Sequence, residues 1–210
     1  EIKQHYHEVL SVLGDCMVSI FDEINKNCQK ELAAVNAQYP FEPLKYRPLG
    51  QTLVISFPEA VKMLRDDGVE MGEFDDFTTP QEKHLGTLVK KKYDLDFYIV
   101  DKYPLGARPF YTMPCPEDPR YTNSYDVFVR GEEITSGAQR IHEVELLKKR
   151  ATECGIPLSN LTSYLESFKY GAWPHGGAGI GLERVVMLFL GLNNIRKSSL
   201  FPRTPDRIFP

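Results

Sequence analysis

A series of short strand-like segments between residues 96 and 141 constrains the fold more than any other feature. The segments are rich in β-branched and aromatic residues, and turn-like spacers at 114–123 and 130–131 separate the later ones. Short spacers of this kind join neighbouring antiparallel strands. The predicted strands are 96–101, 108–113, 124–130 and 132–141. We therefore expect an antiparallel sheet in the middle of the chain.

Helical patterns lie on both sides of these strands. Apolar residues recur at intervals of three and four in residues 4–35, which predicts a long amphipathic helix. The run Thr79-Pro80-Gln81-Glu82 combines an N-cap candidate, Pro at N1 and Glu at N3, so a helix begins there and ends near Tyr93. Further predicted elements are a strand at 53–57 and helices at 59–66, 142–153, 158–168 and 182–192. The fold class is α+β: an antiparallel sheet flanked by helices, with a small helical insertion at 59–93.

Charge and cysteine content exclude several classes of protein. Lys and Arg number 25 and Asp and Glu 29, and this net charge of −4 argues against a nucleic-acid arm or a membrane-surface helix. No apolar run reaches the roughly 20 residues that span a bilayer. The four scattered cysteines form no C-x-x-C pair, which favours free thiols in a reducing compartment such as the cytoplasm. The chain begins without Met or a signal-peptide pattern, which indicates a piece of a longer polypeptide.

Residues 179–184, Gly-Ile-Gly-Leu-Glu-Arg, form a predicted strand-to-helix junction. The helix that follows is almost wholly apolar and should be buried, and a guanidinium such as that of Arg184 is costly to bury without a partner. A phosphate or carboxylate ligand would be such a partner, and Gly179 and Gly181 would let the backbone approach it closely. The alternative is a ligand-free helix end at which Glu183 and Arg184 form local ion pairs. The pattern alone leaves both interpretations open.

The predicted strand 132–141 carries polar side chains that strands usually lack. A carboxylate and a hydroxyl, as at Glu133 and Ser136, suit a hard cation such as Mg²⁺ together with phosphate. Arg140 offers a planar fork for a carboxylate ligand. In an unbroken strand Glu133 and Arg140 point to opposite faces, but a bulge at Gly137 would return them to one face. The alternative is a solvated edge strand without a ligand.

One histidine, His175, lies in the run Pro174–Gly177 just before the junction. Its place next to the phosphate candidate indicates a substrate contact, whereas the alternative is an ordinary loop histidine. No Ser/His/Asp or Cys/His arrangement has a sensible structural context, so covalent hydrolase chemistry is disfavoured.

These motifs resemble those of class II aminoacyl-tRNA synthetases. Residues 179–184 resemble motif 3 of that class, and residues 130–142 resemble a stretch that is particular to the aspartyl group of eukaryotic or archaeal type. Further matching segments are 108–111, 124–126 and 200–203. The resemblance therefore covers essentially the whole chain. The related asparaginyl and lysyl groups share motif 3 and carry different residues at 136–140.

The resemblance implies activation of L-aspartate by Mg·ATP to aspartyl-adenylate, with release of pyrophosphate and transfer of the aspartyl group to tRNA(Asp). It further implies a cytoplasmic homodimer for the full-length enzyme and no membrane partner. On the ATP side, Glu133 and Ser136 would hold Mg²⁺ and phosphates. Arg184 would bind the γ-phosphate and lie against the adenine, in a pocket shaped by Gly179 and Gly181. Glu133 and Arg184 would be catalytic, which fits a reaction that needs positioning and charge neutralisation and no protein nucleophile.

On the amino-acid side, the resemblance implies that Arg140 clamps the side-chain carboxylate of aspartate. His175 and Ser136 would contact the same substrate. One departure concerns this region: the family commonly reads Pro-His-Ala-Gly-Gly-Gly at 174–179, where this chain has Ala178. The methyl group of Ala178 is expected beside the ligand.

A larger departure concerns what residues 1–210 do not contain. The family's anticodon-binding β-barrel, motif 1 at the dimer interface and motif 2 with its α-phosphate arginine are not found. The chain is therefore expected to be the C-terminal part of the catalytic domain and to be inactive alone. Rival interpretations are a relaxed-specificity or asparaginyl synthetase, and a non-catalytic synthetase-like interaction module.

Overall fold

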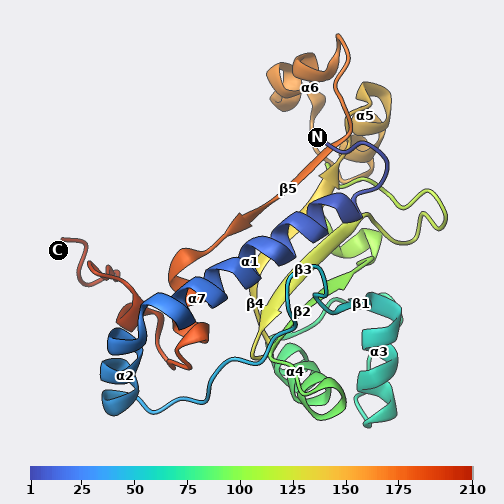
Figure 1. The fold of residues 1–210 in the computed structure, drawn as a ribbon. Helices are drawn as coiled ribbons and strands as arrows, with labels where there is room; N and C mark the ends of the chain where they lie inside the picture. Colours follow the sequence, from blue (N-terminus) through green and yellow to red (C-terminus); the bar gives the residue numbers. More distant parts are fainter. Residues whose placement is uncertain (210) are drawn as a thin grey trace.

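Five strands form one sheet, whose order follows the chain from β1 to β5 (Figure 1). The computed structural model describes residues 1–209. Its strands are β1 (Val54–Ser56), β2 (Phe97–Asp101), β3 (Ser124–Val129), β4 (Glu132–Arg140) and β5 (His175–Ile180). β1 and β2 are parallel, and the other neighbouring pairs are antiparallel. The α+β fold with a largely antiparallel sheet is therefore confirmed.

Helix α1 (His7–Asn27) and helix α7 (Leu182–Phe189) cover one face of this sheet and share a core with it (Figure 1). The helix predicted at 4–35 is interrupted, because Cys28 leaves helical geometry with φ −114° and ψ 33°. A separate helix, α2 (Gln29–Gln38), follows. α2 buries none of its residues fully, but its Leu32 still packs against this core, so α2 lies at the edge of the core.

Helices α3 (Phe57–Asp66) and α4 (Thr79–Tyr93) cover the opposite face and share a second core with it. Both lie in the region predicted as a helical insertion, and both contact strands of the sheet. Each begins at a capping box. In α4 the box lies one position earlier than predicted, because Gln81 Oε1 accepts a hydrogen bond from the Thr78 backbone N–H (2.8 Å). The carboxylate of Glu82 is therefore not used in the cap.

The strand predicted at 108–113 is not formed. The chain makes a 3₁₀ helix at Leu105–Ala107 and then a turn, in which the Thr112 N–H donates to the Pro109 carbonyl oxygen (3.0 Å). An isolated bridge between Thr112 and Arg140 is what remains of the predicted pairing. Three prolines in and around this segment explain the difference, because proline has no N–H to donate to a ladder.

Short helices at one end of β4 and β5 complete the described fold. α5 (Val144–Glu153) and α6 (Thr162–Phe168) form a third, smaller core there (Figure 1). Further 3₁₀ helices are Leu158–Leu161 and Ile195–Ser198. Among residues 1–209, no helix combines the length and the hydropathy needed to cross a membrane.

One extra residue in β4 changes which side chains share a face of the sheet. The pairing of β3 with β4 is regular as far as Thr135, but the next pair joins Phe128 to Glu133, so Ile134 is skipped. This is a β-bulge. It lies three residues before Gly137, where the sequence predicts it. Ile134 turns into the core under α1, and Glu133 returns to the face of Phe128, opposite α1.

Gly137→Ala is expected to lower the free energy of unfolding by about 1–3 kcal/mol. A Cβ at Gly137 would lie 2.5 Å from the ring of Tyr125 and 2.7 Å from the Gly177 carbonyl oxygen. Tyr125 is fully buried and has no space to move aside. Urea unfolding measures the effect. Gly177→Ala is the matched control, because nothing lies within 4 Å of the Cβ it adds, and an equal loss in both variants would contradict the packing explanation.

Candidate functional site

Polar clusters that are separate in the sequence meet along β4 and β5. Because of the bulge, Glu133, Ser136 and Arg140 all project from the face of the sheet opposite α1. The register of β4 and β5 then places Gly179 beside Ser136 and His175 beside Arg140. The site therefore has two ends: one around Glu133 and Ser136 toward α7, and one around Arg140 toward α5 and α6.

Arg184 lies in the first turn of α7, and its side chain is exposed. The expectation of a buried guanidinium is wrong, because the buried side of α7 is formed by other residues, Val185 and Met187–Phe189. Within residues 1–209 neither Glu183 nor Arg184 forms an ion pair, so the alternative of a helix end closed by local ion pairs is wrong as well. The charge of Arg184 is therefore available to a ligand.

Two glycines, Gly179 and Gly181, lie next to this arginine and add no side chain to the site. Nothing lies within 4 Å of the position that a Cβ on Gly179 would take, so the face of β5 is open there. Gly181 is the N-cap of α7, and a Cβ at this position would approach the Arg184 side chain at 3.5 Å. A flat, open strand beside a free guanidinium is suited to a phosphate-bearing ligand.

Several carboxyl groups at this end of the site lie close enough to shift one another's pKa. Burial raises the pKa of Glu133, Asp126 raises it further, and Arg184 opposes the shift. Burial also raises the pKa of Glu82 to about 7, and the charge of Glu133 is the next cause. Glu82 comes from α4, and the sequence analysis gave it a role in the helix cap but none in the site. This concentration of acidic groups favours a bound cation.

Glu82→Gln is expected to stabilise the fold at pH 8 and to leave its stability unchanged at pH 4. The pKa of Glu82 is about 7 in the folded chain and 4.5 for an ordinary glutamate, so the folded state binds this proton more tightly than the unfolded state. The contribution of this proton to the stability of the fold is fully present below pH 4.5, the ordinary pKa of glutamate, and is lost as the pH rises through about 7. Glutamine avoids that loss, which is about 1 kcal/mol once solvent screening is allowed for.

Thermal unfolding at both pH values measures this difference. Glu70→Gln, at an exposed position outside the site, is the matched control and is expected to change stability at neither pH. A gain for Glu82→Gln that is equal at pH 4 and pH 8 would contradict the titration as its cause.

Arg108 and Asp126 are site residues to which the sequence assigned no role. The Arg108 guanidinium donates to Asp126 Oδ2 (2.6 Å) and to the Ser136 hydroxyl (2.9 Å), and it lies 3.9 Å above the ring of Tyr103. Its side chain is 10% exposed and that of Asp126 is 7% exposed. An aspartate next to the apolar run Val127–Val129 of β3 is the signal that could have identified Asp126.

At the other end of the site, Arg140 has a free guanidinium. It lies 4.2 Å above the ring of Tyr111 and forms no ion pair within the described residues. The neighbouring His175 stacks on Phe168 with 5.8 Å between ring centroids, and its Nδ1 lies 2.9 Å from the Trp173 carbonyl oxygen. A carbonyl oxygen only accepts, so we assign the proton to Nδ1 and leave Nε2 available to a ligand.

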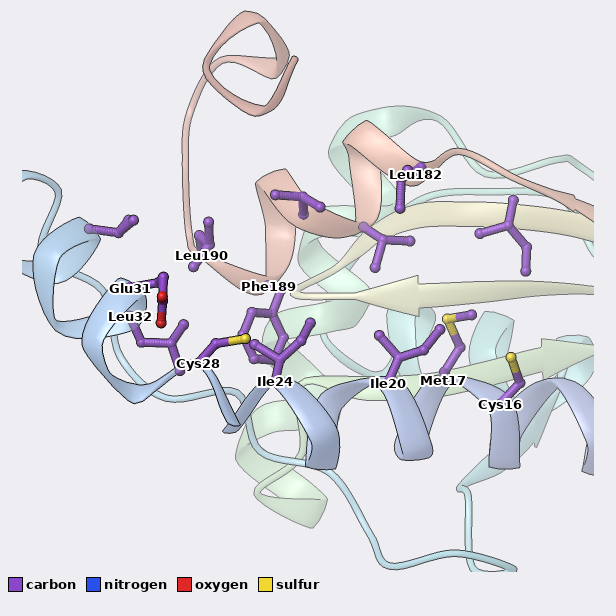
Figure 2. A pocket seen from close by; sticks show the side chains of 14 residues that line it. Cys16, Met17, Ile20, Ile24, Cys28, Glu31, Leu32, Leu182, Phe189 and Leu190 are labelled. Carbon is purple, nitrogen blue, oxygen red and sulfur yellow. The ribbon is translucent and has the colours of Figure 1, made fainter. Parts of the chain in front are cut away.

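An apolar groove of about 310 Å³ lies on the opposite face, between α1, α2, β5 and α7 (Figure 2). Its walls are side chains such as Ile20, Ile24 and Phe189, and Glu31 is the charged residue that lines it. Figure 2 shows these apolar side chains facing one another from α1 and α7. Such walls offer no donors for a phosphate or a carboxylate, so the polar face of β4 and β5 remains the candidate site.

Comparison with known proteins identifies the family. The family model for tRNA synthetases class II (D, K and N) matches residues 2–205. This chain belongs to that family. The cytoplasmic aspartate–tRNA ligase of Homo sapiens is 57% identical over 206 residues, which are 98% of this chain and 41% of the human protein. Aspartate–tRNA ligase 2 of Arabidopsis thaliana is 54% identical over 210 residues, 100% of this chain and 37% of that protein. The chain thus spans about two fifths of the length of these relatives.

Solved structures of class II synthetases have the same fold. The aspartyl tRNA synthetase of Entamoeba histolytica matches with a TM-score of 0.96 and 56% identity, over 100% of this chain and 43% of that one. The asparaginyl-tRNA synthetase of Pyrococcus horikoshii matches with a TM-score of 0.86 and 28% identity, over 99% of this chain and 48% of that one. The fold is common to both groups, and the sequence identity to the aspartyl enzyme is twice as high.

The residues of this synthetase chain fit a magnesium ion that is held jointly with phosphate. Glu133, Asp126 and Ser136 offer the carboxylate and hydroxyl oxygens that Mg²⁺ prefers. Asp126 Oδ1 is buried without a hydrogen-bond partner, whereas Oδ2 accepts from Arg108. Among the described residues, no group of three or more His, Cys, Asp or Glu side chains is placed to hold a metal by itself. The ion would therefore need oxygens from phosphate or water, as Mg²⁺ usually does.

Ala178, the departure from the synthetase pattern, does not face this site. It pairs with Gly137 and packs against the core under α1, whereas its neighbours Gly177 and Gly179 face the other way. The expectation of a methyl group beside the ligand is wrong for this reason. This orientation follows from the alternation of side chains along β5 and from the register of β5 with β4.

Proposed function

We propose that these 210 residues are the C-terminal part of the catalytic domain of an aspartate–tRNA ligase. The free guanidinium of Arg140, backed by Tyr111, is the observation that carries the proposal. A planar fork of this kind recognises a carboxylate, which the side chain of aspartate has and that of asparagine lacks. The high identity to aspartate–tRNA ligases supports the same assignment.

The proposed reaction has two steps. An oxygen of the aspartate α-carboxylate attacks the α-phosphorus of ATP, the bond from that phosphorus to the bridging oxygen of the β-phosphate breaks, and pyrophosphate leaves. A hydroxyl of the 3′-terminal ribose of tRNA(Asp) then attacks the carbonyl carbon of aspartyl-adenylate, and AMP leaves. Neither step needs a protein nucleophile, so the residues of the site act by positioning and by neutralising charge.

At the phosphate end, Glu133, Asp126 and Ser136 are proposed to hold Mg²⁺, which supplies charge neutralisation to the phosphates when it is bound. Arg184 binds the γ-phosphate and lies against the adenine. The open face of β5 at Gly179 receives the nucleotide. The exposure of Arg184 supports this assignment, because its charge is not used within the described residues.

At the amino-acid end, Arg140 holds the side-chain carboxylate of aspartate. His175 contacts the same substrate, and stacking on Phe168 supports a fixed orientation of its ring. Ser136, on the same face of β4, lies between the two ends and contacts aspartate as well as the metal. Two substrates thus meet along one strand, which is the arrangement that adenylate formation requires.

The full-length enzyme is proposed to be a polypeptide in which further residues precede these 210 and supply motifs 1 and 2 and an anticodon-binding barrel. It acts as a homodimer in the cytoplasm. The Homo sapiens and Arabidopsis thaliana relatives are described as cytoplasmic, which supports the location.

Pyrophosphate exchange and tRNA charging by the full-length enzyme test the proposal. We expect exchange that depends on aspartate and not on asparagine, and charging of tRNA(Asp) and not of tRNA(Asn). Charging of both tRNAs would indicate a relaxed enzyme, and use of asparagine would indicate an asparaginyl enzyme. Failure to bind ATP and a non-hydrolysable aspartyl-adenylate analogue would favour the non-catalytic interaction module.

A further inference from the structure

We infer that Arg108 is a positioning residue for the magnesium and phosphate end of the site, an inference that rests on the proposed function. Its guanidinium joins two strands, since one nitrogen donates to Asp126 on β3 and the other to Ser136 on β4. These are two of the three side chains proposed to hold the ion. Arg108 therefore acts on the ion through its ligands.

The backbone around Arg108 is held in place. Arg108 precedes Pro109 and is extended (φ −121°, ψ 150°), as residues before proline usually are. The ring beneath it belongs to Tyr103, whose carbonyl oxygen accepts from both the backbone N–H (2.8 Å) and the hydroxyl (2.9 Å) of Thr122. That ring packs against Phe57 in the core under α3, with 4.8 Å between centroids. The guanidinium thus lies on a rigid surface.

The two hydrogen bonds leave defined atoms free for a ligand. Asp126 Oδ2 accepts a hydrogen bond from Arg108. The other carboxylate oxygen, Oδ1, is buried and has no hydrogen-bond partner. The Ser136 hydroxyl accepts from Arg108 with one lone pair, so its second lone pair and its proton remain available. One arginine therefore orients an acceptor on each of two strands.

Arg108 also compensates the charge of Asp126. A carboxylate that is 7% exposed is costly without a counter-ion, and the guanidinium at 2.6 Å supplies one. Its own side chain is 10% exposed, with the terminal nitrogens engaged by Asp126 and Ser136. Arg108 is therefore placed to act through Asp126 and Ser136 and not by direct contact with substrate.

Arg108→Lys in the full-length enzyme separates positioning from charge. Lysine keeps the positive charge beside Asp126, but its single ammonium group cannot span Asp126 and Ser136 in one plane. We expect about a tenfold rise in the Mg²⁺ concentration that gives half-maximal ATP binding in equilibrium titrations. The affinity for Mn²⁺ in the presence of ATP, measured by the free-ion signal in electron paramagnetic resonance, should fall by a similar factor. The affinity for ATP without a divalent ion should stay within twofold of wild type.

Arg120→Lys is the matched control, because Arg120 also pairs with an aspartate, Asp118, but at an exposed position outside the site. It should leave both metal affinities unchanged. Ser136→Ala removes the hydroxyl that accepts from Arg108. Because Ser136 is exposed, this variant can be measured even if Arg108→Lys fails to fold. It is expected to raise the Mg²⁺ requirement as well.

Unchanged Mg²⁺ and Mn²⁺ affinities in folded Arg108→Lys, or an unchanged Mg²⁺ requirement in Ser136→Ala, would overturn the positioning role. A wild-type enzyme whose ATP binding does not depend on Mg²⁺ would overturn the proposed function itself, and the inference with it. The two failures are therefore distinguishable.

Discussion

The 210-residue chain alone is expected to catalyse aspartate-dependent pyrophosphate exchange more than about a thousandfold more slowly than the full-length enzyme. Adenylate formation places charge on the α-phosphate, and a preorganised group that meets such charge contributes roughly a hundred- to a thousandfold in rate. The arginines that the structure places at the site have other partners or proposed roles. Arg108 pairs with Asp126, Arg140 lies over Tyr111 at the proposed amino-acid end, and Arg184 is proposed to bind the γ-phosphate. None is left for the α-phosphate, and the resemblance assigns that task to motif 2.

Exchange assays on the purified chain and on the full-length enzyme decide this prediction. Arg184→Ala in both proteins is the control for activity that does not come from the site. Exchange by the chain within tenfold of the full-length rate, abolished by Arg184→Ala, would show that the motif 2 arginine is not needed. Circular dichroism of the chain distinguishes inactivity of a folded protein from unfolding.

Arg140→Lys in the full-length enzyme is expected to lower kcat/KM for aspartate by about 10- to 150-fold. Lysine cannot reproduce the two-donor fork, and the loss of one charged hydrogen bond costs on the order of 1.5–3 kcal/mol. It also loses the planar contact with Tyr111, above which the guanidinium now lies at 4.2 Å. ATP binding should be spared, because Arg140 is at the opposite end of β4 from Glu133.

Initial-rate exchange at varied aspartate and at varied ATP measures both effects. Arg120→Lys again serves as the control, because it makes the same substitution in a surface ion pair. If the KM for aspartate and the activation rate both stayed at the wild-type value, the carboxylate clamp would have to be another residue. Equal losses for aspartate and ATP would indicate a general distortion of β4.

The fold was largely predictable because its elements have local signals. Apolar periodicity and capping residues placed α3 and α4 close to their observed bounds, and they placed the start of α1 but not its end at Asn27. The prediction of a strand at 108–113 was wrong because it rested on the β-like composition of the segment. Pro109 cannot donate a hydrogen bond to a ladder, and this outweighs the composition. The break at Cys28 had no signal in the apolar periodicity, because apolar residues beyond it, such as Leu32, still pack against the same core.

The site was predictable as a set of strand-borne residues but not as a network. Charged and polar side chains are unusual in strands and at the start of apolar helices, and this made four residues stand out in the sequence: Glu133, Ser136, Arg140 and Arg184. Arg108, Asp126 and Glu82 belong to three different elements, and their relation depends on tertiary contacts that span 18 to 28 residues for the Arg108 bonds. The exposure of Arg184 and the orientation of Ala178 likewise depend on which face of an element meets the core.

The skipped residue at Ile134 has a consequence for how such a site can diverge. It shifts the alternation of side chains by one residue in the middle of β4, so that Glu133 shares a face with Ser136 and Arg140. A substitution at Arg140, the proposed aspartate contact, leaves the bulge in place, so Glu133 and Ser136 keep the face on which they are proposed to hold Mg²⁺ and phosphate. A common nucleotide half and a variable amino-acid half on one strand would let related synthetases change substrate while they keep the same chemistry.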